Sequence, residues 1–229
     1  MSTRIANGNT RLSEPSFLSF WPRVREFAVP ASMIETATAR RLAGDWAGAC
    51  AAAGVDVDLD LRSVVRDHGR ETAACLRQDL RHLAPDLLRW HMPRIAPDGL
   101  LRPGLTLALA KYGGERGGRG PLHLVVRTPP AWADAGQRIS LGLWQGAANP
   151  GSTHPHPRPS RRFRFDLHRH LWDARRVGEL RIRAGGGLPD GDPPGLDPDL
   201  LRTLPYGRGC AVDRWADEAR LLVRADGRS

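Results

Sequence analysis

Apolar residues recur at helical spacing in the first half of the chain, most clearly over residues 71–84, after a predicted stop at Gly69. Within that stretch, intervals of three and four residues place the apolar positions on one face of a helix. They are Ala73, Leu76, Leu80 and Leu83. Pro85 ends the pattern, and Asp86 begins a second short helix that runs to Trp90.

Two further helices are predicted upstream, because each is preceded by residues that cap helices. Ser32 and Glu35 have the spacing of a capping box, which predicts a helix over residues 33–43. A second helix follows, capped by the carboxylate of Asp45 and extending to about Ala53. The N-terminal half is therefore predicted to be mainly helical.

After residue 103 the pattern changes to an alternation of apolar and polar positions, which is typical of strands. The predicted strands cover residues 105–109, 122–126, 139–144, 162–171, 180–183 and 221–223. The first two flank a glycine-rich segment, residues 113–120, and so predict a hairpin. A short helix over residues 213–219 precedes the last strand.

These elements predict an α+β fold, with a helical N-terminal half packed against a mostly antiparallel β-sheet in the C-terminal half. The predicted organisation is an extended N-terminal segment at 1–30, a helical region at 31–99 and a β-rich region at 100–229. The last two regions are together of a length that a single domain can have.

The composition of the chain predicts the cellular compartment of the protein. Of the 229 residues, 41% are hydrophobic and 26% are charged, which is ordinary globular usage. No apolar run approaches the roughly 18 residues that a membrane span needs, and residues 1–30 lack the apolar core of a signal peptide. Cys50, Cys75 and Cys210 are odd in number and form no C-x-x-C pair, which indicates a reducing compartment. We therefore expect a cytoplasmic protein without membrane contact.

The charge of the chain indicates an acidic partner. Lys and Arg number 34 against 25 Asp and Glu, and Lys111 is the only lysine. The net charge of +9 is concentrated in residues 151–187, where nine arginines accompany three acidic residues. A local excess of this kind attracts either an acidic protein surface or nucleic acid.

The arginines of residues 161–170 are the first candidate site. If this stretch is a strand, Phe163, Phe165 and Leu167 point to the core and the charged residues share the outer face, which the next predicted strand extends. Guanidinium groups bind anions in a bidentate manner. The binding residues predicted in this way are Arg161, Arg162, Arg164, Arg169, Arg181 and Arg183. The competing interpretation is the ordinary solvated face of an antiparallel sheet.

The function predicted first is a non-catalytic binding or interaction protein that needs no cofactor. Inward-pointing aromatic rings cannot stack on bases, so a protein partner is favoured over nucleic acid. A role as a subunit of a larger assembly stays open, because core and interface tryptophans have the same sequence signature.

A metal site is the alternative, from a different class of function. On a strand, His168 and His170 share one face with Asp166, and these are ligands that suit zinc or manganese. His154 and His156 add imidazoles from a proline-rich loop. The pattern predicts a metal-dependent hydrolase or nuclease, although no H-E-x-x-H motif accompanies it.

The alternating carboxylates Asp56, Asp58 and Asp60 invite two sharper interpretations, a calcium loop and an aspartate nucleophile. Leu61 stands where a calcium loop requires glycine, and no buried apolar strand precedes Asp56 as a nucleophile would require. The plainer interpretation is an edge strand or loop whose last residues cap the next helix.

Overall fold

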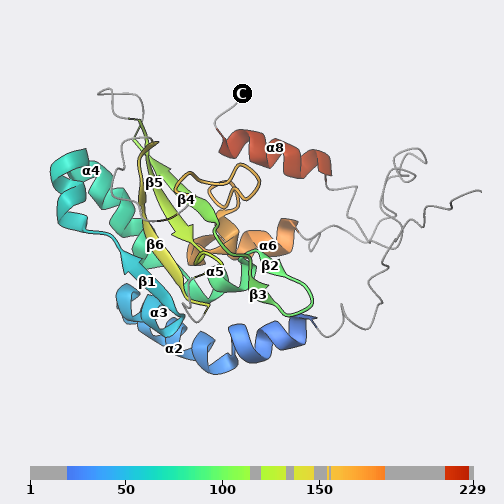
Figure 1. Ribbon diagram of the computed structural model, residues 1–229. Helices are drawn as coiled ribbons and strands as arrows, with labels where there is room; N and C mark the ends of the chain where they lie inside the picture. The colour runs from blue at the N-terminus through green and yellow to red at the C-terminus, as the bar shows by residue number, and fades with distance from the viewer. Residues whose placement is uncertain are drawn as a thin grey trace, which may run out of the picture.

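A four-stranded sheet lies at the centre of the molecule, with helices packed against it (Figure 1). The computed structural model describes residues 20–113, 120–132, 137–146, 154, 156–183 and 215–226. In spatial order the strands are β1 (Val55–Asp58), β6 (Ile139–Trp144), β5 (Leu122–Arg127) and β4 (Thr106–Tyr112). β1 runs parallel to β6, and the other neighbours are antiparallel. The predicted hairpin and the predicted third strand are therefore confirmed.

One face of the sheet forms the core with α4 (Leu61–His82). The sheet contributes fully buried side chains from adjacent strands, including Leu107, Leu124, Val126 and Leu141. The helix contributes Ala73, Leu76 and Leu80, as their spacing predicted. Gly69 bends α4 where a stop was predicted, because its φ of 85° departs from helical geometry between two helical segments.

The remaining N-terminal helices are η1 (Val24–Ala28, a π-helix), α2 (Ala31–Leu42), α3 (Trp46–Ala52) and α5 (Pro85–His91). Asp45 caps α3 through a backbone amide, as predicted. The Ser32 cap is wrong, because α2 begins directly after Pro30 and Ser32 already lies inside the helix. Residues 20–28 are helical, where an extended segment was predicted.

β1 joins the two halves of the chain in one sheet. Val55 lies in register with Ile139, and the Arg138 guanidinium donates to the Asp56 carboxylate at 2.6 Å. Asp60 accepts hydrogen bonds from backbone amides in the first turn of α4. The edge-strand interpretation of the alternating carboxylates is thus confirmed. A separate two-stranded hairpin, β2 (Arg94–Ile95) with β3 (Leu100–Leu101), follows α5.

Three strands predicted for the C-terminal half are wrong. Residues 162–171 form turns and the 3₁₀ helix η3 (Arg169–Leu171), and they meet the sheet at a single bridge between Ala108 and Arg164. Residues 180–183 belong to α6 (Gly178–Arg183), and residues 221–223 to α8 (Trp215–Ala225). Another 3₁₀ helix, η4 (Ala174–Arg176), precedes α6.

The physical reason for the missing strand is the burial of Trp172. Its indole nitrogen donates to the carbonyl of Phe165 at 3.0 Å, and the side chain is fully buried. An extended strand separates residues seven apart by about 23 Å, so the chain must turn to make this contact. The alternating pattern of residues 162–171 is therefore compatible with a folded-back loop.

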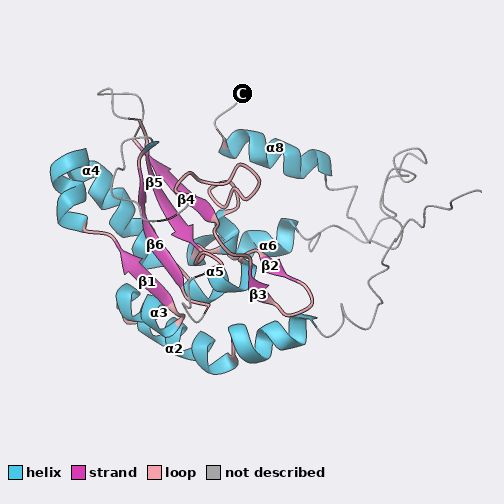
Figure 2. Ribbon diagram, viewed as in Figure 1, coloured by secondary structure: helices cyan, strands magenta, loops and turns pink. Residues whose placement is uncertain are grey.

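The α+β class predicted from the sequence is confirmed, with helices and a mostly antiparallel sheet sharing one core (Figure 2). Within the described residues, no helix has the length and apolar character needed to cross a membrane. Cys50 and Cys75 are free thiols. Cys210 and the tip of the glycine-rich segment lie outside the described residues.

Candidate anion-binding surface

The arginine-rich segment runs along β4, the edge strand of the sheet. The backbone amide of Ser160 donates to the carbonyl of Thr106 at 2.7 Å, and the Thr106 hydroxyl donates to the carbonyl of His156 at 2.7 Å. Further along the same strand, Ala108 forms a parallel bridge with Arg164. The loop therefore holds its arginines beyond the β4 edge of the sheet.

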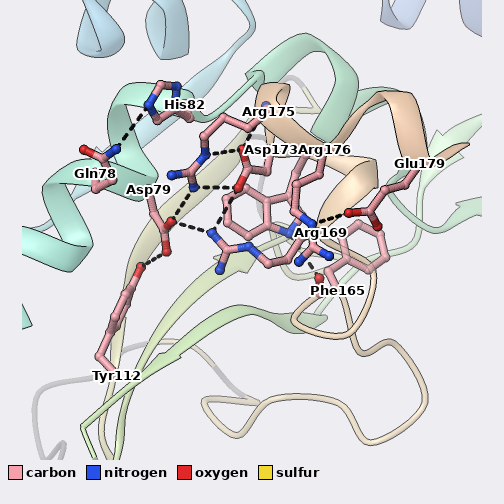
Figure 3. Close-up of polar contacts among 11 residues, drawn as sticks. Gln78, Asp79, His82, Tyr112, Phe165, Arg169, Asp173, Arg175, Arg176 and Glu179 are labelled. Atoms are coloured by element: carbon pink, nitrogen blue, oxygen red, sulfur yellow. Dashed lines mark hydrogen bonds and ion pairs between the residues drawn. The ribbon is translucent and has the colours of Figure 1, made fainter. Parts of the chain in front are cut away.

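Asp79, buried on α4, accepts hydrogen bonds from three side chains of other elements (Figure 3). The Tyr112 hydroxyl on β4 donates to it at 2.8 Å, and the Arg175 guanidinium on η4 donates at 3.0 Å. Arg169 on η3 donates to the same carboxylate. Burial and the Asp79 carboxylate raise the pKa of Tyr112, so its hydroxyl remains a donor. Helix, sheet and C-terminal segment are thereby joined at one point.

Asp173 is the second carboxylate of this buried network. Its side chain is fully buried and accepts from Arg175 at 2.7 Å and from Arg169 at 3.1 Å. Burial alone would raise the pKa of Asp173, but the hydrogen bonds from the two arginines outweigh it and keep this pKa below its ordinary value. Asp173 therefore stays charged and holds both guanidinium groups.

Arg169 is thus a structural residue in this fold, although the sequence predicted a binding role for it. Its guanidinium carbon also lies 4.5 Å from the ring centroid of Trp172, a cation–π contact. We call the group Asp79, Tyr112, Arg169, Asp173 and Arg175 the buried network. Its arginines are already engaged by carboxylates, which leaves them poorly suited to an external anion.

Arg164 makes a different set of contacts, nearer the surface. Its guanidinium binds Asp166 in a bidentate manner, at 2.9 and 2.7 Å, and donates to Asp226, the residue directly after α8, at 2.9 Å. The Arg164 side chain is 36% exposed and that of Asp226 is 26% exposed. The second carboxylate at this guanidinium therefore comes from a helix 62 residues further along the chain.

Arg183 on α6 binds a carboxylate near the start of α8. Its guanidinium donates to the Glu218 carboxylate at 2.8 Å, and His168 Nδ1 lies 3.8 Å from the same carboxylate. The Glu218 side chain is 32% exposed. Arg164 and Arg183 thus each hold one carboxylate of α8, and both were among the predicted binding residues.

Four further arginines of the segment form no ion pair within the described part of the chain and are exposed: Arg158, Arg161, Arg162 and Arg181. The Arg162 guanidinium carbon lies 5.5 Å from the ring centroid of Phe163, and Phe165 is buried. We define the basic surface as Arg158, Arg161, Arg162, Arg164 and Arg183. It occupies a loop and a short helix, where the sequence predicted a sheet face.

The five predicted metal ligands do not come together in one site. The carboxylate of Asp166 is bound by Arg164, and His154 Nε2 lies 3.0 Å from the carbonyl of Thr128. His156 is exposed, and the rings of His168 and His170 lie edge to face with centroids 5.8 Å apart. Across the residues that the structure describes, no three His, Cys, Asp or Glu side chains are grouped to hold a metal ion.

His170 is nearly fully buried, and this burial lowers its pKa to about 4, with Arg183 and His168 acting in the same direction. Glu179 opposes the shift, and His91 adds to it. The imidazole is therefore neutral at neutral pH.

The prediction missed the carboxylates that decide which arginines are engaged. Asp79 carried a signal, because it lies beside Leu76 and Leu80 on the apolar face of a helix, where an unpaired charge is costly. Glu218 and Asp226 carried a weaker one, an interval of eight residues that places both on one side of a helix. Neither signal indicates which arginine the carboxylate binds.

Comparison with known proteins gives no match: no family model, no curated protein and no solved structure is similar to this chain. Function is therefore inferred from the surface itself. Guanidinium groups bind carboxylates and phosphates through paired N–H donors. Two arginines of this segment already bind carboxylates, Arg164 that of Asp226 and Arg183 that of Glu218.

Proposed function

We propose that the protein is a non-catalytic binding protein whose basic surface contacts an acidic segment of a protein partner. The observation that carries the proposal is the pairing of Arg164 and Arg183 with carboxylates of α8. Arg158, Arg161 and Arg162 lie on the same loop as Arg164 and form no ion pair among the described residues. The surface therefore combines two arginines that bind carboxylates of the same chain with three that form no ion pair among the described residues.

A protein partner is favoured over nucleic acid by the placement of the aromatic rings. Single-stranded nucleic acid is usually bound by exposed rings on which bases stack. In the described part of the segment, Phe165 and Trp172 are buried and Phe163 is half-buried under Arg162. The proposal includes a cytoplasmic location, which the free thiols of Cys50 and Cys75 support.

Binding at this surface should be weak for each contact and sensitive to salt. An exposed ion pair contributes about 0 to 1 kcal/mol, so several arginines must act together. Screening shortens the reach of each charge to about 10 Å at 0.1 M salt. An affinity that survives high salt would contradict this mode of binding.

The test is fluorescence anisotropy with two labelled probes, a polyglutamate peptide and a single-stranded oligonucleotide, at about 50 and 200 mM NaCl. The full chain is expected to bind the peptide, with an affinity that falls at the higher salt concentration. Tighter binding of the oligonucleotide would replace the protein partner by nucleic acid. Binding of neither probe would overturn the proposed function.

A matched pair of variants locates the site. Replacing Arg158, Arg161 and Arg162 by Gln should weaken peptide binding about tenfold, since three contacts of about 0.5 kcal/mol are removed. The control replaces three exposed arginines of α4, Arg70, Arg77 and Arg81, by Gln. An equal loss in both triple variants would mean that only net charge matters.

A further inference from the structure

α8 rests on the molecule through one side only. Glu218, Leu222 and Asp226 are spaced four residues apart, so they lie along one face of the helix. Glu218 and Leu222 are half-buried, and no described side chain of residues 217–226 is fully buried. Figure 1 shows α8 on the outside of the molecule, beyond the loop that covers β4.

The attachment of α8 is mainly electrostatic. Glu218 binds Arg183 at 2.8 Å and Asp226 binds Arg164 at 2.9 Å, one at each end of the contact face. Leu221 and Val223 remain 39% and 47% exposed, so they add little apolar burial. The Arg164–Asp226 pair lies at the surface, and the Arg183–Glu218 pair is partly buried, with the Arg183 side chain 10% exposed. Because surface ion pairs stabilise weakly and are screened by salt, we expect docking of α8 to be reversible.

The chemistry of α8 matches what the basic surface is proposed to bind. Glu218 and Asp226 lie eight residues apart, which is about 12 Å along a helix. In the folded chain, Arg164 and Arg183 bind two carboxylates that have this spacing. An acidic helix of a partner with the same spacing would meet the same two guanidinium groups.

We propose, on the basis of the function assigned above, that α8 is an internal competitor for the basic surface. It occupies Arg164 and Arg183 until an acidic helix of a protein partner displaces it. A tethered segment acts at an effective concentration of about millimolar, so it lowers the apparent affinity of any competitor. The apparent affinity falls in proportion to the fraction of molecules whose surface is free.

The experiment compares three full-length proteins. They are the wild type, the double variant Glu218→Gln with Asp226→Asn, and a charge-matched control, Asp217→Asn with Asp67→Asn. Asp217 points away from the contact face and pairs with Arg220 on its own helix, and Asp67 lies on α4. Both double variants therefore gain the same net charge, and only one loses the carboxylates that dock α8.

The probe is a labelled synthetic peptide with the sequence of residues 213–229, which carries both docking carboxylates. The docking variant should bind it about tenfold more tightly than the wild type and the control do. A second peptide with Gln and Asn in place of Glu218 and Asp226 should bind none of the three proteins more tightly than the others.

The outcomes separate this inference from the proposed function. If all three proteins bind the first peptide equally well, the surface takes acidic helices but α8 does not compete, and this inference alone fails. If none binds either this peptide or polyglutamate, the proposed function fails and the inference with it. Added polyglutamate should also lower the hydrogen-exchange protection of α8 in the wild type, and unchanged protection would count against displacement.

Discussion

The buried network and the basic surface both contain arginines from the same segment of the chain, but these arginines differ in what they do. Arg169 and Arg175 meet carboxylates whose side chains are 0 to 10% exposed. Arg164 and Arg183 meet α8 carboxylates that are 26 and 32% exposed. A buried carboxylate cannot lose its partner without a large penalty, whereas an exposed one exchanges its partner with water. Burial therefore separates the carboxylates that are fixed to their arginines, Asp79 and Asp173, from those that can exchange partners, Glu218 and Asp226.

This difference explains why the arginine content alone is a poor guide to function. Nine arginines lie in residues 156–183, but two of them hold the fold together through Asp79 and Asp173. Four others form no ion pair among the described residues. The proposed function assigns the binding of an acidic partner to three of these four, Arg158, Arg161 and Arg162, together with Arg164 and Arg183.

The largest effect is expected from Asp79→Ala in the buried network. The variant leaves Arg169 and Arg175 short of a carboxylate and the Tyr112 hydroxyl without its acceptor. Removing one partner of a buried ion pair typically lowers the free energy of unfolding by about 3 to 5 kcal/mol. Urea denaturation of the variant measures this loss.

Two controls sharpen the result. Asp67→Ala removes a carboxylate from an exposed pair on the same helix and should change the free energy of unfolding by no more than about 0.5 kcal/mol. Tyr112→Phe removes one hydrogen bond and should cost about 1 kcal/mol. Equal effects for Asp79 and Asp67 would show that burial does not separate the two kinds of arginine.

The helices and the first strands were predictable because their signals are local. The spacing of Leu76 and Leu80, the cap at Asp45 and the alternation in residues 139–144 each extend over a few residues. The parallel pairing of β1 with β6 was not predictable, because no local pattern connects Val55 with Ile139. The α+β class followed from the local signals, and the sheet order did not.

The error at residues 162–171 has a physical cause outside that segment. Alternating arginines and aromatics satisfy a strand pattern, yet Arg169 binds Asp79, 90 residues away in the chain. The burial of Trp172 beneath the same arginine turns the segment back on itself. Short stretches such as residues 180–183 offer too few positions to distinguish a strand from a helical turn. The sequence drew attention to these arginines, but it did not predict their division between network and surface.

A smaller effect is expected from the titration of His170, which lies between the two regions. Its pKa in the folded protein is about 4, against 6.5 for an exposed histidine, so the unfolded chain takes up a proton first as the pH falls. The free energy of unfolding should therefore drop between about pH 6.5 and pH 4, by on the order of 2 kcal/mol, and the contribution should level off below pH 4.

The measurement is urea denaturation of the wild type and His170→Gln at several pH values in this range. The variant should show a shallower dependence than the wild type, because one of the protons taken up by the unfolded chain is gone. His156→Gln, on the exposed loop, serves as the comparison. Identical slopes for the wild type and His170→Gln would contradict a neutral, buried His170 in the folded protein.

Raising the salt concentration is expected to change the free energy of unfolding least. It also gives the most direct contrast between the buried network and the basic surface. Raising NaCl from about 0.05 to 0.5 M shortens the screening length severalfold, which weakens the exposed pairs of Arg164 and Arg183 much more than the buried pairs of Asp79. Hydrogen exchange followed by mass spectrometry should show α8 (Trp215–Ala225) losing protection while the second half of α4 keeps it. The variant Glu218→Gln with Asp226→Asn should show low α8 protection at both salt concentrations. If α8 in the wild type keeps its protection at high salt, its docking depends on more than the two ion pairs, and the basic surface is part of the permanent fold.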